Sequence, residues 1–435
     1  MPAHLHTANL YKFDDVVSAL QKCIRRGEAA QALFWAGELE QGFEYILYSR
    51  LWTIVAEDIG LAAPYLALEL FPLYQEWVKV HKTNPEKGKE ITLQIVYTLA
   101  KAPKNRIVDN LFLYTYFQPK PSVTWTAQQP SQALQEKIQL LFSVNLFAAQ
   151  EEKEIDLQAA LLQLAACLEA RDVENAFFFC NFINLSTEES THTPWLHQYL
   201  ELPNTIKIDS KTAKKVGVYN WYVLFELSKG NPQLWNLLKV LYQLYIAKVG
   251  SPVLLMTFAV LLCCYQEKLK TTPVSSNLLE VPKAMQDCYY NNGTTITERR
   301  KLSIPDYAID KHTDRGKGSP YAPHNIADLH TEAQKKRIPT HAWSTEEIAK
   351  SHGAYKKFAD YKQAGQHSRM SHFFTEGALL NNVPASWLGE DPYEEGVLRY
   401  FLTLEKKYGY KACSGFFIYE KMRPIWIANQ TLWKK

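Results

Sequence analysis

The stretch LWTIVAEDIGLAAPYLALEL, residues 51–70, decides the fold of the first part of this chain. Its first half is apolar with a helical period and ends in two adjacent acids, Glu57 and Asp58. A glycine two residues later interrupts the helix. Pro64 then favours the start of another helix, because proline fits the first helical turn. We therefore expect two consecutive helices with a pair of carboxylates at the joint.

Helical patterns continue on both sides of this stretch, separated by glycines, prolines and polar turns. The expected helices cover residues 14–26, 28–39, 43–56, 64–80, 89–101 and 106–117. The helix that begins at Pro64 is expected to kink or split at Pro72, since a proline inside a helix removes a hydrogen bond. Together these segments predict a multi-helix bundle over residues 12–118.

Three motifs occur together in this bundle: ALFWAGELEQG at residues 32–42, AEDIGLAAPYLAL at 56–68 and YTLAKAPKN at 97–105. In sequence and spacing they resemble the helical C-terminal part of the RarA/MgsA clamp-loader-like ATPases, a group that includes the Werner-helicase-interacting ATPase. The resemblance covers roughly residues 13–117. It implies a collar-like fold of the kind through which the subunits of such ATPases assemble.

The ATPase half of that family has no counterpart in this sequence. Its Walker A loop, G-x-x-x-x-G-K-[ST], holds nucleotide phosphates on backbone N–H groups. The Gly-Lys pairs at residues 88–89 and 316–317 have neither the earlier glycine nor a following serine or threonine. We therefore expect no nucleotide hydrolysis of the P-loop kind and no cofactor, and no other catalytic motif is recognisable. What remains of the family pattern is the part that assembles.

The paired acids admit a catalytic and a structural interpretation. Two carboxylates can transfer protons or hold Mg²⁺. Adjacent residues on an α-helix point about 100° apart, however, so they share one proton or one metal with difficulty. We expect a structural role, in which one acid pairs with Arg50 or Lys104 and the other caps the next helix. The candidate structural or interface residues are Trp35, Glu57, Asp58 and Lys104.

We expect a second helical domain over residues 130–270, with features of a degenerate repeat. The segment SALQKCIRRGEAAQALFWAGEL, residues 18–39, aligns without gaps with LQLAACLEARDVENAFFFCNFI, residues 162–183. Duplication of a helical hairpin would produce such a match. The alternative is that two amphipathic helices joined by a short turn resemble each other by chance.

The amino-acid composition indicates what class of protein this is. The chain has 435 residues, of which 47% are hydrophobic and 13% aromatic, so a large folded core is expected. Seven cysteines without a C-x-x-C predict reduced, buried thiols. The N-terminus lacks a secretory signal, and the most apolar run, residues 253–265, is too short for a membrane span, which needs roughly 20 residues. We expect a cytoplasmic or nuclear protein without a membrane segment.

The charge is unevenly distributed. The net charge is +3, and from residue 281 onward 23 Lys and Arg stand against 17 Asp and Glu, a balance of +6. The first 280 residues therefore hold 25 against 28, a balance of −3. A basic C-terminal domain, small and of mixed α/β structure, is expected over residues 300–435. Its aromatic end, residues 413–433, favours a short strand or hairpin.

The expected C-terminal domain contains a loop rich in charged residues, IPDYAIDKHTDRGKGSPYAPH, residues 304–324. Lys311, Arg315 and Lys317 are candidate nucleic-acid contacts that would neutralise phosphates, with Tyr307 stacking on a base. A solvated loop whose charges satisfy each other is the other main interpretation.

A third interpretation of this loop is an enzyme or metal site. Asp310, His312 and Asp314 alternate along the chain, and an extended chain would present them on one side. The remaining histidines have no repeated ligand spacing, and we expect no metal.

These observations predict a mostly α-helical, non-motor scaffold or adaptor in DNA replication, recombination or repair. It would form a homo-oligomer or dock on a partner ATPase or replication protein, with DNA contact by the tail. Two alternatives remain: an enzyme with a site in residues 306–317, and a structural protein without a nucleic-acid role.

Overall fold

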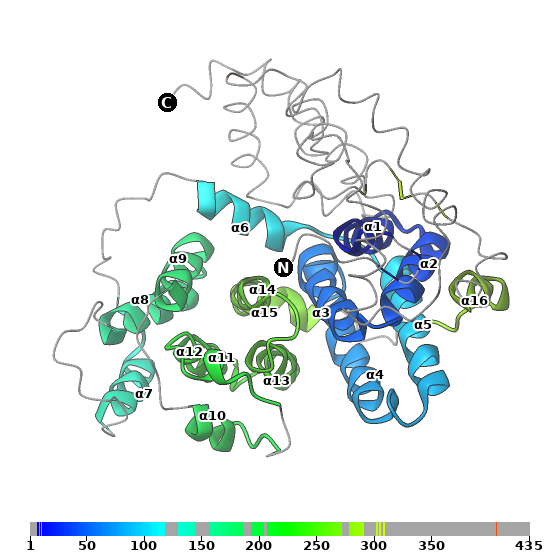
Figure 1. Cartoon of the computed structure of the whole chain (residues 1–435). Helices are drawn as coiled ribbons and strands as arrows, with labels where there is room; N and C mark the ends of the chain where they lie inside the picture. The colour runs from blue at the N-terminus through cyan, green and yellow to red at the C-terminus, as the bar shows by residue number, and fades with distance from the viewer. Residues whose placement is uncertain are drawn as a thin grey trace, which may run out of the picture. The chain divides into compact units, whose positions relative to one another are not determined.

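The computed structural model is mostly helical, with no strand in the part of the chain that it describes (Figure 1). The described residues are 7, 9, 11–117, 129–143, 157–185, 193–203, 207–271, 278–290 and the single positions 302, 304, 305, 308 and 406. The helical class predicted from the sequence is confirmed for this part. The expected α/β domain at 300–435 falls outside it, apart from those single positions, and gains no support.

The chain divides into two compact units. Unit 1 combines Met1–Leu51, Pro72–Lys104 and Asn277–Lys435, and unit 2 combines Trp52–Phe71 with Asn105–Ser276. These boundaries differ from the expected 12–118 and 130–270, because residues 52–71 group with the segment that follows residue 104.

Unit 1 is built on a helical hairpin against which the later helices pack. It contains α1 Phe13–Arg26, α2 Ala29–Glu40, most of α3 Glu44–Ile54, the last part of α4 Leu66–Val80, α5 Pro85–Lys101 and α16 Lys283–Tyr290. α2 lies against α1, α5 and α16, and its apolar residues are buried nearly throughout. Figure 1 shows α16 beside α2, although more than two hundred residues separate them in the sequence.

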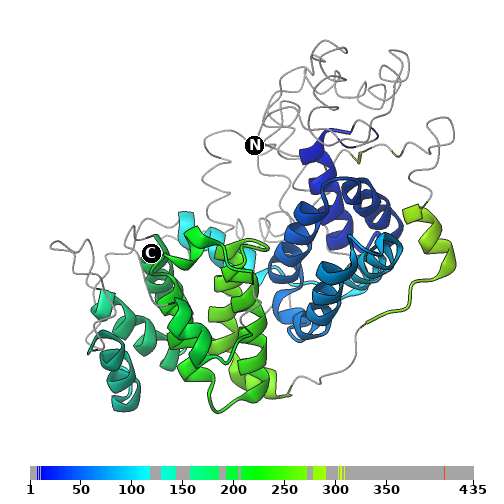
Figure 2. The ribbon, with the colours of Figure 1, turned by 60° about the horizontal axis from the view of Figure 1, so that its bottom comes forward.

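Unit 2 is built around one fully apolar helix. Its elements are η1 Val55–Ile59, η2 Gly60–Ala62, α6 Ile107–Phe117, α7 Gln132–Ser143, α8 Leu157–Glu169, α9 Val173–Leu185, α10 Thr193–Tyr199, α11 Ser210–Ala213, α12 Val218–Ser228, α13 Pro232–Ile246, α14 Pro252–Cys264 and α15 Gln266–Thr271. The helices of unit 2 that are drawn in green lie beside one another (Figure 2). α14 contacts α6, α8, α9, α12 and α13, and its residues from 254 to 264 are all buried. A helix that is apolar on every side is expected at the centre of a fold.

The apolar run at 253–265 thus forms the core of unit 2. Among the described residues, no helix combines the length and the apolar character needed to cross a membrane.

Two helix boundaries differ from the expected ones for identifiable reasons. α5 begins at Pro85, four residues earlier than expected, because the Asn84 side chain accepts a hydrogen bond from the Lys87 N–H at 3.1 Å. α4 begins at Leu66, two residues after Pro64, because a π turn and a 3₁₀ turn precede it. It then continues through Pro72 as one helix.

The two segments that align in sequence form hairpins with matching turns. In the α1–α2 hairpin, Gly27 has φ 76° and the next N–H donates to the Cys23 carbonyl at 2.9 Å. In the α8–α9 hairpin, Arg171 has φ 58° and the next N–H donates to the Cys167 carbonyl at 2.8 Å. Gly27 and Arg171 occupy equivalent positions in the alignment. The similarity therefore extends from the sequence to the geometry of the turn.

The described cysteines are mostly buried thiols, as the composition predicted. Cys23, Cys167, Cys180, Cys263 and Cys264 are all buried. Burial raises the pKa of Cys167 and of Cys264 to about 12, since a thiolate loses hydration in an apolar core. These two thiols therefore stay protonated and unreactive at neutral pH.

Candidate functional site

The paired acids lie in η1, a single turn of π-helix that continues α3. Such turns are rare and are frequently found at functional sites. Gly60 ends the turn with φ 47° and ψ −129°, and its N–H donates to the Val55 carbonyl. A Cβ at this position would lie 3.3 Å from Val108 Cγ2. Glycine is required here because the backbone conformation is strained for other residues and the space is small.

The start of α6 is attached to this turn through the backbone. The Asn105 N–H donates to the Asp58 carbonyl oxygen at 2.9 Å. The Asn105 side-chain oxygen in turn accepts a hydrogen bond from the Ile107 N–H at 2.8 Å and so satisfies the first turn of α6. Asn105 therefore brings the next residue, Arg106, next to the paired acids.

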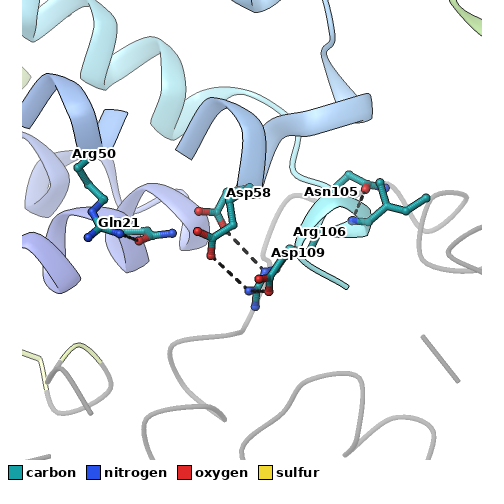
Figure 3. A network of polar contacts seen from close by, with 8 residues as sticks. Gln21, Arg50, Asp58, Asn105, Arg106 and Asp109 are labelled. Carbon is teal, nitrogen blue, oxygen red and sulfur yellow. Dashed lines mark hydrogen bonds and ion pairs between the residues drawn. The ribbon is translucent and has the colours of Figure 1, made fainter. Parts of the chain in front are cut away.

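Arg106 lies among three carboxylates (Figure 3). Its Nη2 is 3.5 Å from Glu57 Oε1, its Nε is 3.8 Å from Asp58 Oδ1, and its Nη2 also contacts Asp109 Oδ2, one helical turn further on. The Asp58 side chain is fully buried, and the other three side chains are 14–15% exposed. We call these four residues the Arg106 cluster.

The Arg106 cluster suits structural support better than acid–base chemistry. A guanidinium group does not lose its proton in proteins, and it favours the charged form of a carboxylate beside it. The expectation that two adjacent acids face different partners assumed α-helical geometry. In the π turn both acids reach the same base, and that base is Arg106, which the sequence interpretation did not consider. Its spacing of three residues from Asp109 was the available signal.

The bases considered from the sequence, Lys104 and Arg50, lie in unit 1 and have hydrogen-bond partners there. Lys104 is fully buried, and its ammonium donates to the carbonyl oxygens of Ala100, at 3.2 Å, and Ala102. It thus satisfies carbonyl groups at the C-terminal end of α5, where a positive charge is favourable. Arg50 donates to the Gln21 side chain at 2.9 Å (Figure 3).

Trp35 belongs to the core of unit 1. Its side chain is 0% exposed, and its ring lies edge-on to Tyr11, with ring centroids 5.2 Å apart, and to Phe34, at 4.8 Å. Its role in this fold is packing. An interface near α2 would have to be made by the more exposed residues around it.

A second buried polar group, in unit 1, was not found from the sequence. The Thr92 hydroxyl lies 2.9 Å from Glu40 Oε1, 3.1 Å from the Tyr48 hydroxyl and 3.0 Å from the Gly88 carbonyl oxygen. We call Glu40, Thr92 and Tyr48 the Glu40 group. The residues come from three helices, and Thr92 is 52 residues from Glu40 and 44 from Tyr48, so no spacing pattern could have identified the group.

The Glu40 group has no arginine, and its electrostatics differ accordingly. Burial raises the pKa of Glu40 from 4.5 to about 7, with smaller opposing effects of the Thr92 hydrogen bond and the Lys89 charge and a further increase from nearby acids. Burial also raises the pKa of Tyr48, which keeps its proton. Glu40 is therefore a carboxyl group that titrates near neutral pH.

The nucleic-acid candidates Lys311, Arg315, Lys317 and Tyr307 lie outside the described residues, as does the rest of the Asp306–Lys317 loop. In the part of the chain that the structure describes, no group of three or more His, Cys, Asp or Glu side chains is arranged to hold a metal ion.

Comparison with known proteins found no match: no protein-family model, no curated protein and no solved structure is similar to this chain. The resemblance to the clamp-loader-like ATPases therefore depends on the three motifs alone.

Proposed function

We propose that this chain is a non-motor scaffold or adaptor in DNA replication, recombination or repair, which acts inside the cell by self-association and by contact with a partner or DNA. The observation that carries the proposal is the Arg106 cluster. The acids of the AEDIG motif, in the segment that resembles an assembly collar, hold a turn to the start of a helix. The most conspicuous polar residues of that segment thus contribute to shape, while chemistry would belong to a partner.

Self-association is the first property to test. The molar mass of the purified chain can be measured by light scattering after size exclusion, over a wide concentration range. A mass of two or more chains, or a mass that rises with concentration, supports assembly. A single-chain mass at every concentration contradicts self-association and leaves docking on a partner as the only form of the proposal.

DNA contact can be tested in the same experiment by adding forked DNA. A complex that dissociates as salt rises is expected, because phosphate neutralisation releases counterions. The triple variant Lys311→Ala, Arg315→Ala and Lys317→Ala should bind more weakly and lower the slope of log K against log salt by about 3, since each phosphate contact contributes about 1.

The matched control removes three exposed lysines from unit 2: Lys211→Ala, Lys214→Ala and Lys215→Ala. It should leave the slope unchanged. Equal loss in both triple variants would indicate a general charge effect, and no loss in the tail variant at low salt would refute DNA contact by residues 311–317.

A further inference from the structure

Unit 1 contains a hollow between α5 and the segment that leads into α16. Its volume is about 360 Å³, at the small end of the range for ligand sites, roughly 300–1,000 Å³. The lining residues are Glu90, Leu93, Gln94, Leu279, Glu280, Val281, Gln286 and Tyr290. The walls are held in place on both sides, because α16 packs on α2 and the Leu279 N–H donates to Thr98 Oγ1 at 3.2 Å.

One part of this hollow is apolar and exposed. Leu279 is 37% exposed and Tyr290 is 38% exposed, and both are among the most exposed large apolar side chains that the structure describes. Leu93 and Val281 complete the apolar wall. Exposed apolar groups around one hollow gain free energy when another molecule covers them.

The charged residues that line the hollow are all acidic. Two carboxylates, Glu90 and Glu280, line the hollow, and no lysine or arginine is among its described lining residues. The Lys87 ammonium lies 3.4 Å from Glu90, but both side chains are well exposed, at 45% and 61%, so water screens this pair. The Gln286 amide donates to the Val281 carbonyl at 3.0 Å, which leaves its oxygen as an acceptor.

The acids near the hollow also act on the Tyr290 hydroxyl. Burial raises the pKa of Tyr290, and the negative charges of Glu86, Glu90 and Glu40 raise it further. The Tyr290 hydroxyl therefore keeps its proton. A positive group that enters the hollow beside this ring lies near the carboxylate of Glu90, which lines the hollow.

We propose that this hollow binds an organic cation, an ammonium or guanidinium group carried on an apolar body. The cationic head lies between the carboxylates of Glu90 and Glu280, and the body covers Leu93, Leu279 and the Tyr290 ring. Hydrogen bonds to carboxylates and the burial of apolar area then act on the same molecule. This site is separate from the Arg106 cluster and goes beyond the scaffold function.

Two kinds of molecule carry such a cation: a small free amine, and a partner polypeptide with an arginine or lysine side chain. The probes are 4-phenylbutylamine for the first source and a blocked tripeptide with a central arginine between two leucines for the second. Each has a neutral counterpart of the same shape, 4-phenylbutanol and the same tripeptide with citrulline. Titration calorimetry on the full chain measures all four.

At least one cationic probe should bind, and its neutral counterpart should bind about tenfold more weakly or worse, because a hydrogen bond between charged groups is about twice as strong as a neutral one. Preference for the amine identifies a small-molecule site, and preference for the arginine peptide identifies a docking site for a partner side chain. Either result supports the proposal. Equal affinity for charged and neutral probes, or no binding of either cation at millimolar concentration, overturns it.

Substitutions in the hollow test whether the probes bind there. Glu90→Gln with Glu280→Gln should weaken the cationic probe about tenfold or more and leave the neutral probe unchanged, since only the charges are removed. Val281→Trp should abolish binding by filling the hollow. Glu76→Gln removes an exposed carboxylate elsewhere on unit 1 and should change nothing. Thermal unfolding confirms that each variant is folded, and unchanged affinity in both folded hollow variants contradicts the assignment.

Discussion

Units 1 and 2 contain similar helical hairpins, but their buried acids have different partners. The turns after α1 and α8 have equivalent backbone hydrogen bonds and a residue with positive φ at the same aligned position, Gly27 in one and Arg171 in the other. Yet unit 2 surrounds Arg106 with three carboxylates, whereas unit 1 buries Glu40 against the hydroxyl of Thr92. In the first case a guanidinium group lies beside the acids. In the second, desolvation favours the protonated acid and moves its pKa to about 7.

The acids of the two units thus differ in their partners as well as in their burial. Asp58 is buried completely, more deeply than Glu40, but it lies beside a guanidinium group. We therefore test unit 2 by removing the charge of Arg106, and unit 1 by changing the pH.

The largest expected effect is the removal of the charge that holds the three acids of unit 2. Arg106→Met should lower the free energy of unfolding by about 3 kcal/mol or more, because breaking a buried charge pair leaves a charge in the interior. Denaturant unfolding followed by circular dichroism measures this. Arg171→Met is the control, since Arg171 and Glu267 form a pair 3.8 Å apart with both side chains about half exposed, and its loss should cost less than about 1 kcal/mol. Equal effects of the two substitutions would contradict the structural role of the Arg106 cluster.

The second largest expected effect is a change in how stability depends on pH, and it arises from Glu40 in unit 1. Because the pKa of folded Glu40 is raised, from 4.5 to about 7, its protonated form stabilises the fold fully below pH 4.5. That contribution is lost as the pH rises through 7, and over this span it amounts to at most about 3 kcal/mol. Glu40→Gln should remove this loss and make the chain more stable than the parent at pH 8.

Stability measured from pH 4 to pH 9 checks this prediction. The parent should lose stability between pH 4.5 and pH 7 relative to Glu40→Gln. Glu76→Gln, which changes an exposed acid of the same unit, should follow the parent curve. A Glu40→Gln curve parallel to the parent curve would show that Glu40 titrates at its ordinary pKa.

The smallest effect tests the likeness of the two hairpins. Gly27 and Arg171 both have positive φ, which costs a residue with a Cβ about 1 kcal/mol. Glycine should therefore be more stable than alanine by about 1 kcal/mol at both positions. The comparison is Gly27→Ala against the parent, and Arg171→Gly against Arg171→Ala, which removes the same charge in both chains. A glycine preference at only one of the two positions would show that the turns differ.

The sequence predicted most of the helices but little of the polar chemistry. Helical periodicity and the breaks at Gly27 and Pro103 located the segments, because a buried apolar stripe depends on local spacing. The π turn at residues 55–59 was missed, since it inserts one residue without a distinctive pattern. The bounds of the two compact units differ from the expected domain ranges, because they depend on which distant helices pack together.

The same limit applies to individual site residues. Glu57 and Asp58 stood out as adjacent acids, but Arg106 is forty-eight residues beyond Asp58, and only the fold brings it to them. Glu40, Thr92 and Tyr48 come from separate helices, so their hydrogen bonds could not be read from spacing. Chemistry made by long-range contacts requires the tertiary structure.

A double-mutant cycle between Arg106 and Asp58 gives the sharpest test of the structural role of the paired acids. Arg106→Met, Asp58→Asn and the double variant are compared with the parent by denaturant unfolding. If the paired acids serve the fold through Arg106, the double variant should lose less stability than the sum of the single variants, with a coupling of about 2 kcal/mol. Effects that add to within about 0.5 kcal/mol would contradict this role.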